Sequence, residues 1–95
     1  MNSAVTEILI GLLSIFNGLI EVYMWVIIIA ALLTFVRPDP FNPIVQILYR
    51  VTNPAYALVR RFIPTMFNGI DLAPLVIIIS LQIAQVFVRA LIHAL

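Results

Sequence analysis

Apolar positions along the chain form two long runs, over residues 8–36 and 72–94, separated by a more polar segment over residues 37–70. About 20 consecutive apolar residues are enough for a helix to cross the ~30 Å hydrocarbon core of a lipid bilayer. Both runs reach that length, and Arg37-Pro38-Asp39-Pro40 marks the end of the first because proline interrupts a helix. The pattern therefore predicts two transmembrane helices joined by a connecting segment.

Two spans place both ends of this chain on one side of the membrane. The first run has no positively charged leader and follows Glu7, so we expect it to be retained rather than cleaved as a signal. It is also longer than the hydrocarbon core requires, which predicts either a tilted helix or first turns that lie among the headgroups. The two runs are therefore expected to form a hairpin.

Two Asn-Pro pairs in the connecting segment, Asn42-Pro43 and Asn53-Pro54, each have the composition of a helix start. Asparagine is a preferred N-cap residue, and proline is favoured at the first helical position. Apolar residues follow each pair at the i, i+3, i+4, i+7 spacing of a helix with one apolar face. They are Ile44, Ile47, Leu48 and Val51 after the first pair, and Ala55, Leu58, Val59 and Phe62 after the second. The segment is predicted to contain two short amphipathic helices at the membrane surface, the alternative being a loop with chance periodicity.

Turn and helix-start signals end the connecting segment. Pro64 ends the second amphipathic helix, and Asn68-Gly69 is typical of a tight turn. Asp71 is expected to be the N-cap of the second span, with Pro74 in its first turn. The predicted fold class is an all-α membrane protein, a hairpin of two transmembrane helices joined by a basic segment with two interfacial helices.

Composition agrees with lipid as the solvent and narrows the chemistry. Hydrophobic residues make up 64% of the chain and charged residues 9%, against about 25% charged in ordinary soluble domains. A net charge of +1 argues against a nucleic-acid partner. The sequence has no cysteine and one histidine, His93, which leaves no thiol chemistry and no cluster of metal ligands. Without a recognisable catalytic constellation or phosphate loop, we expect neither enzyme activity nor a cofactor or metal.

Arginines are distributed unevenly about the spans. Arg37, Arg50, Arg60 and Arg61 lie in the connecting segment, whereas Arg89 belongs to the terminal side. Positive charge accumulates on the cytoplasmic side of membrane proteins, so the connecting segment is predicted to be cytoplasmic and the termini extracytoplasmic. The four connecting-segment arginines are candidate contacts for lipid headgroups or for a partner protein.

Polar side chains within the spans fall on one stripe of each predicted helix. In the second span Gln82, Gln85 and Arg89 lie at i, i+3 and i+7. In the first span the stripe consists of Gly11, Ser14, Asn17, Gly18, Glu21 and Trp25. Small residues allow helices to approach closely, and polar residues within a bilayer need partners. We therefore expect the two stripes to face each other.

Glu21 and Arg89 are the charged members of these stripes. Counted from the connecting ends of the spans, they lie at nearly the same depth, ~22 Å and ~25 Å. Glu21 is predicted to pair with Arg89, in the same chain or in a partner subunit, with Asn17 and Gln85 as neighbours. Packing that fixes the helix register is the favoured role for this cluster. A lining for ions or protons, or snorkelling of Arg89 to the interface, are the alternatives.

An ordered set of short motifs runs through most of the chain. The motifs are Phe35-Val36-Arg37-Pro38-Asp39-Pro40-Phe41-Asn42-Pro43-Ile44, Thr52-Asn53-Pro54, Arg60-Arg61-Phe62-Ile63-Pro64 and Gly69-Ile70-Asp71-Leu72-Ala73-Pro74. This set resembles the YggT (YlmG) family of small integral membrane proteins, in its single-repeat form. Phe35, Leu58 and Ala73 depart from residues common in that family, which are tryptophan, proline and serine.

The resemblance implies a location but leaves the function open, and the residues of the spans favour two classes of function. It implies a multi-pass protein of the bacterial plasma (inner) membrane, and the single copy of the unit suggests self-association. The first function is a non-catalytic membrane adaptor, or an assembly factor of the cell envelope, with lipids and other membrane proteins as partners. The alternative is a subunit of an oligomeric potassium or proton pathway involved in osmotic or ionic stress tolerance.

Overall fold

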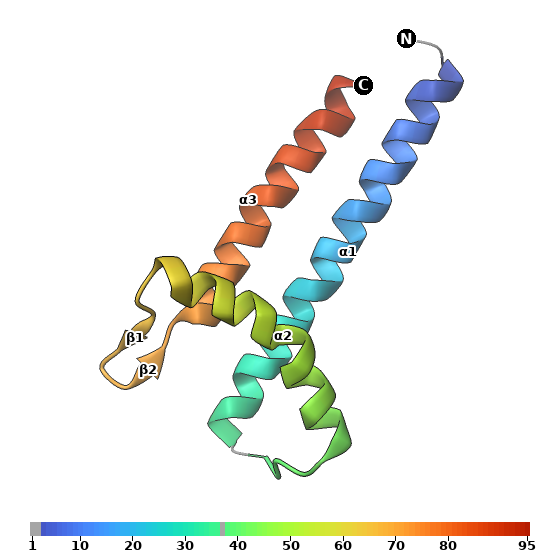
Figure 1. Ribbon diagram of the computed structural model, residues 1–95. Helices are drawn as coiled ribbons and strands as arrows, with labels where there is room; N and C mark the ends of the chain where they lie inside the picture. The colour runs from blue at the N-terminus through green and yellow to red at the C-terminus, as the bar shows by residue number, and fades with distance from the viewer. Residues whose placement is uncertain (1–2, 37) are drawn as a thin grey trace.

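The computed structural model describes residues 3–36 and 38–95, which form three helices and one small sheet (Figure 1). Helix α1 covers Ser3–Val36, α2 covers Pro43–Phe62 and α3 covers Ala73–Ala94. Strands β1, Met66–Phe67, and β2, Ile70–Asp71, lie between α2 and α3. Arg37, one of the predicted headgroup contacts, lies outside the described residues.

Helices α1 and α3 are long and apolar enough to cross a membrane. They run side by side in opposite directions, so the start of α1 and the end of α3 lie at the same end of the molecule in Figure 1. The predicted end of the first span and both ends of the second agree with the structure to within one residue. The predicted start at residue 8 was wrong, because α1 already begins at Ser3. Neither glycine nor proline occurs between Ser3 and Ile10, so nothing in that stretch interrupts the helix.

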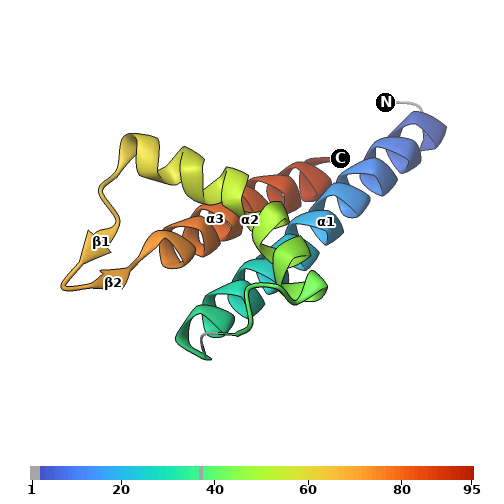
Figure 2. The same cartoon turned by 60° about the horizontal axis from the view of Figure 1, so that its bottom comes forward.

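Helix α2 crosses the α1/α3 pair as one continuous helix (Figure 2). The predicted start is confirmed, because the Asn42 side chain accepts a hydrogen bond from the Ile44 N–H at 2.9 Å and Pro43 opens the helix. The predicted second start was wrong, because Asn53 and Pro54 lie inside α2. Proline removes one backbone donor, leaving the Arg50 carbonyl without its usual helical partner. Since Arg50 is exposed, this loss does not bury an unpaired carbonyl.

A β-hairpin between α2 and α3 was not predicted, although its turn was. Met66 pairs with Asp71 and Phe67 with Ile70, in antiparallel register. Asn68 and Gly69 form the turn with φ angles of 52° and 80°, as a two-residue hairpin turn of type I′ requires. The Leu72 N–H donates to the Thr65 carbonyl at 2.9 Å and closes the base of the hairpin. The chain is therefore not purely helical.

The start of α3 differs slightly from the prediction. Leu72, rather than Asp71, occupies the N-cap position. The Asp71 carboxylate nevertheless accepts a hydrogen bond from the Ala73 N–H at 2.9 Å, and Pro74 lies in the first turn as expected. Asp71 thus supplies the capping interaction from one residue further out.

Two buried clusters hold the helices together. Where all three helices meet, Ile27, Tyr56, Ala73 and Ile77 form one cluster. Nearer the chain ends, α1 and α3 pack directly through Ile20, Met24 and Val88.

Contact residues on both long helices recur at alternating steps of three and four. We call Leu13, Asn17, Ile20, Met24 and Ile27 the α1 seam. We call Ile78, Leu81, Gln85, Val88 and Ile92 the α3 seam. This spacing is typical of helices that lie nearly antiparallel with interlocking side chains.

Candidate functional surfaces

A polar contact between α1 and α3 lies on the two seams. The Gln85 side chain is buried, with 4% of its surface exposed. Its Nε2 donates to Glu21 Oε2 at 2.9 Å and lies 3.4 Å from the backbone carbonyl of Asn17. Three members of the predicted polar cluster, Asn17, Glu21 and Gln85, are therefore brought together. Asn17 contributes its backbone, while its side-chain Oδ1 is buried without a partner.

The predicted direct pair between Glu21 and Arg89 is not formed within the chain. Arg60–Asp71 is the ion pair that the described residues form, and Glu21 bonds to Gln85 instead. Arg89 follows the seam residue Val88 and is exposed. One residue turns a helix by about 100°, which directs Arg89 away from α1. Gln82 follows the seam residue Leu81 and is exposed for the same reason.

Most of the small-residue stripe predicted on α1 also misses α3. Gly11, Ser14, Gly18 and Trp25 are exposed, and no atom lies within 4 Å of where a Cβ would stand on either glycine. The residues that do face α3 lie one position earlier and are mainly large and apolar, such as Ile20 and Met24. The prediction that these four residues face the second span of the same chain was therefore wrong.

A second polar contact lies where α2, the β-hairpin and α3 meet. The Arg60 guanidinium forms an ion pair with Asp71, and it lies 5.4 Å from the centre of the Tyr56 ring. Burial alone would raise the pKa of Asp71, but the Ala73 N–H and Arg60 outweigh it, so the pKa is below its usual value. Asp71 therefore connects the end of α2 to the beginning of α3.

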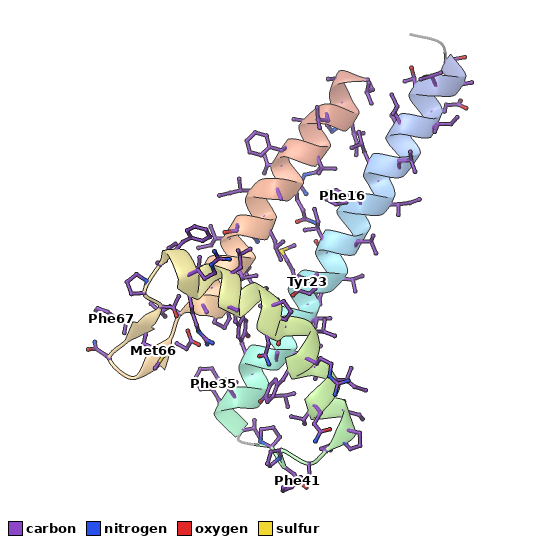
Figure 3. All side chains as sticks on the ribbon, viewed as in Figure 1. Phe16, Tyr23, Phe35, Phe41, Met66 and Phe67 are labelled. Atoms are coloured by element: carbon purple, nitrogen blue, oxygen red, sulfur yellow. The ribbon has the colours of Figure 1, made fainter. Side chains whose placement is uncertain are left out.

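Beside this contact is a cavity of about 370 Å³. Its polar wall includes Tyr56 and Asp71, and its apolar wall includes Phe35 and Met66. Figure 3 shows Phe35 at the end of α1 and Met66 on the β-hairpin, on the two sides of this space. Burial raises the pKa of the Tyr56 hydroxyl, and the nearby Asp71 charge adds to the effect. The phenol is therefore neutral in the physiological range.

Helix α2 exposes two flanks of opposite character. The apolar flank consists of Ile44, Ile47, Val51, Leu58 and Phe62. The polar flank lies about a third of a turn around the helix from the apolar flank. It consists of Gln46, Arg50, Asn53, Arg60 and Arg61, all exposed. Three of the four predicted headgroup-contact arginines are thus on one surface.

Two tyrosines that we did not assign to the site attach α2 to the long helices. The Tyr23 hydroxyl donates to the Val51 carbonyl at 2.9 Å. Tyr56 is buried against Ile27 and Ile77, and its hydroxyl finds no partner among the described residues. Tyr23 lies one position before the seam residue Met24. Its contact with α2 could have been predicted only if the alternating three- and four-residue spacing of the α1 seam had first been identified in the sequence.

Phenylalanine substitutions at these tyrosines are expected to change stability in opposite directions. Tyr23→Phe removes a hydrogen bond and should lower the free energy of unfolding by about 0.5–1.5 kcal/mol. Tyr56→Phe removes a buried hydroxyl without a partner, so it should leave the free energy unchanged or raise it by up to about 1 kcal/mol. Unfolding in mixed micelles measures both, and Tyr49→Phe is the control. Equal losses at Tyr23 and Tyr56 would contradict the assignment.

The described residues contain no group of three metal-ligating side chains. What the surfaces offer chemically is hydrogen bonding within the chain, exposed arginines and a large exposed apolar area.

Comparisons with known proteins place the chain in a family. It is 40% identical over 62 residues to an uncharacterized protein of Pseudomonas aeruginosa, covering 65% of this chain and 31% of that protein. It is 37% identical over 76 residues to an uncharacterized protein of Vibrio alginolyticus, covering 80% of this chain and 40% of that protein. The chain thus spans less than half the length of these curated relatives. No solved structure matches it. The CCB3/YggT family model matches residues 9–92, so the chain belongs to the CCB3/YggT family.

Proposed function

We propose that this protein is a non-catalytic membrane adaptor or assembly factor of the cell envelope. The observation that carries the proposal is the position of α2, which is fixed to both long helices and leaves its arginine-bearing flank free. Tyr23 fastens α2 to α1, and Tyr56 packs against Ile77 of α3. A rigid, exposed basic surface of this kind is suited to recognition rather than to chemistry.

The two flanks of α2 support a position at the membrane surface. An amphipathic helix at the interface buries its apolar side among the acyl chains and keeps its charged side in the headgroups or in water. On the apolar flank, the side chain of Ile47 is 57% exposed and that of Phe62 is 74% exposed, so lipid can cover this flank. The polar flank, with Arg50 and Arg61, then faces headgroups or a partner protein.

The same placement supports an orientation in the membrane. In Figure 1, α2 and its arginines lie toward the end of the molecule opposite the start of α1 and the end of α3. An excess of arginine near the ends of spans favours the cytoplasmic side. We infer that α2 and the β-hairpin are cytoplasmic and that both chain ends are on the opposite side of the plasma membrane.

Polar groups between the spans support packing rather than transport. Gln85 is directed at Glu21 and at the Asn17 backbone, so these groups bind one another. A polar contact of this type fixes the rotation and depth of one helix against another. It gives the adaptor a defined shape on which other helices can assemble.

Reversal of charge on the polar flank of α2 tests the proposal. The double variant Arg50→Glu, Arg61→Glu is expected to reach the membrane in normal amounts but to lose a stoichiometric partner when extracted in native lipid discs. The matched control is Arg50→Lys, Arg61→Lys, which keeps the charge. Arg60 is left unchanged in both variants, because it also binds Asp71.

Ion transport would be the contrary outcome. Purified protein in lipid vesicles should give no potassium or proton flux above that of empty vesicles. Two results together would replace the adaptor with a subunit of an ion pathway. These are a flux that Glu21→Ala abolishes, and full recovery of the partner by the Arg50→Glu, Arg61→Glu variant.

A further inference from the structure

Each long helix carries a second row of residues, one position after its seam. On α1 this row includes Ser14, Gly18 and Glu21, and on α3 it includes Gln82, Val86 and Arg89. Both rows keep the alternating steps of three and four found in the seams. All six residues are exposed. Each long helix therefore presents, beside its seam, a second row of residues that the chain itself leaves uncovered.

The two rows lie on the same side of the α1/α3 pair. A step of one residue turns a helix by about 100°, and since α1 and α3 are antiparallel, the same forward step turns both helices toward one side. Helix α2 occupies the other side, where it contacts Tyr23 and Ile77, each one position before its seam. We call the surface formed by the two rows the open face.

Charged and polar groups of the open face are only partly satisfied among the described residues, where the Ser14 hydroxyl donates to the Ile10 carbonyl. Arg89 and Gln82 form no ion pair or hydrogen bond among the described residues. Glu21 binds Gln85 through Oε2, which leaves its Oε1 available. In a membrane-spanning helix, arginine almost always faces another helix or water rather than lipid, and glutamine hydrogen-bonds across helix contacts. The open face therefore has the chemistry of a helix interface.

We propose that the open face binds a second copy of this chain, related by a two-fold axis along the membrane normal. This symmetry places α1 of one copy beside α3 of the other, again antiparallel, so that four long helices form a bundle. The proposal depends on both helices lying in lipid, but not on the adaptor function.

Depth and charge select this occupant. Glu21 is level with Gln85, because their side chains are 2.9 Å apart. Arg89 lies one turn beyond Gln85, about 6 Å nearer the chain ends. A rotation about the membrane normal conserves depth, so Glu21 of each copy lies within reach of the partner's Arg89. Two symmetric ion pairs form, and each compensates a charge that the single chain leaves exposed.

Close approach is possible at the centre of the open face. A Cβ added at Gly18 would meet no atom within 4 Å, so nothing in the chain itself occupies this space. Small residues at such positions let two helices in lipid come into contact. In the proposed arrangement Gly18 faces Val86 of the second copy.

Disulfide formation between two chains tests the geometry directly, because the natural sequence has no cysteine. A chain with Gly18→Cys and a differently tagged chain with Val86→Cys are made together and oxidised in native membranes. A disulfide-linked heterodimer is expected. The control pair, Leu19→Cys with Phe87→Cys, uses exposed residues one position before the seams and should give none. Equal yields from both pairs, or no product from the first, would overturn the proposal.

Neutralisation of Arg89 tests the chemistry. Arg89→Gln removes no contact within the chain, so the monomer should fold normally. Energy transfer between labelled chains in vesicles, measured as the ratio of protein to lipid is varied, should show dimer dissociation increased about ten-fold or more. The control Arg50→Gln, on α2, should leave dimer dissociation unchanged. Wild-type protein that stays monomeric at every ratio, or unchanged dimerisation of the Arg89 variant, would exclude the proposed pairing.

Discussion

Replacement of Ile27 by alanine is expected to lower the free energy of unfolding by about 2–5 kcal/mol. Ile27 is completely buried at the point where α1, α2 and α3 meet, against Tyr56, Ala73 and Ile77. Truncation leaves a cavity that three rigid elements border, so the surroundings cannot collapse easily to fill it. Among the residues of α2, those buried are Val45, Thr52 and Tyr56. We therefore expect α2 to detach from the long helices before these separate.

The control is Ile29→Ala, the same change two residues further along α1. Ile29 is 46% exposed, so its loss should cost less than about 1 kcal/mol. Titration of SDS into dodecyl maltoside micelles measures both variants, and Trp25, the one tryptophan of the chain, is the fluorescent probe. Similar destabilisation by the two substitutions would mean that α2 does not pack on α1 as described.

The long helices could be predicted from sequence because their signal does not depend on tertiary structure. The two runs are long and apolar enough to cross a membrane. Pro38 lies two residues after the end of α1, and Asp71 lies two residues before the start of α3. The start of α1 was harder to predict, since neither glycine nor proline marks it.

The two Asn-Pro pairs show where local signals fail. Asn42-Pro43 begins α2, whereas the identical dipeptide Asn53-Pro54 lies in its interior. Thr52 is completely buried and donates to the Leu48 carbonyl at 3.0 Å, and Tyr56 is buried on the other side of the pair. Since residues both before and after Pro54 are held against the same helices, tertiary packing keeps α2 continuous despite its proline.

The polar cluster shows a different limit. The sequence predicted correctly that Glu21, Asn17 and Gln85 come together, because depth follows from counting residues along each span. It did not predict the rotation of each helix, and an error of one residue is an error of about 100°. The small and polar stripe on α1 was therefore predicted to face α3, although the apolar α1 seam is the surface that faces it.

Gln85→Ala is expected to lower the free energy of unfolding by about 1–3 kcal/mol, and Arg89→Ala by less than about 0.5 kcal/mol. Gln85 donates to Glu21 and approaches the Asn17 carbonyl, so alanine leaves both the Glu21 carboxylate and the Asn17 carbonyl without this donor. Arg89 has no such contact in the chain. Measurement at high dilution in micelles keeps any second copy of the chain from contributing.

Variants of Glu21 separate the hydrogen bond from the charge. Glu21→Gln keeps an oxygen that can accept from Gln85, so it should be less harmful than Glu21→Ala. The double variant Glu21→Ala, Gln85→Ala should lose less stability than the sum of the two single variants. The expected difference is about 0.6–1.7 kcal/mol, from the average to the largest value for such contacts in membrane proteins. If Arg89→Ala were instead the more harmful change and coupled to Glu21, the pair expected from sequence would hold. The rotation of α3 against α1 would then differ from the one described by about one residue.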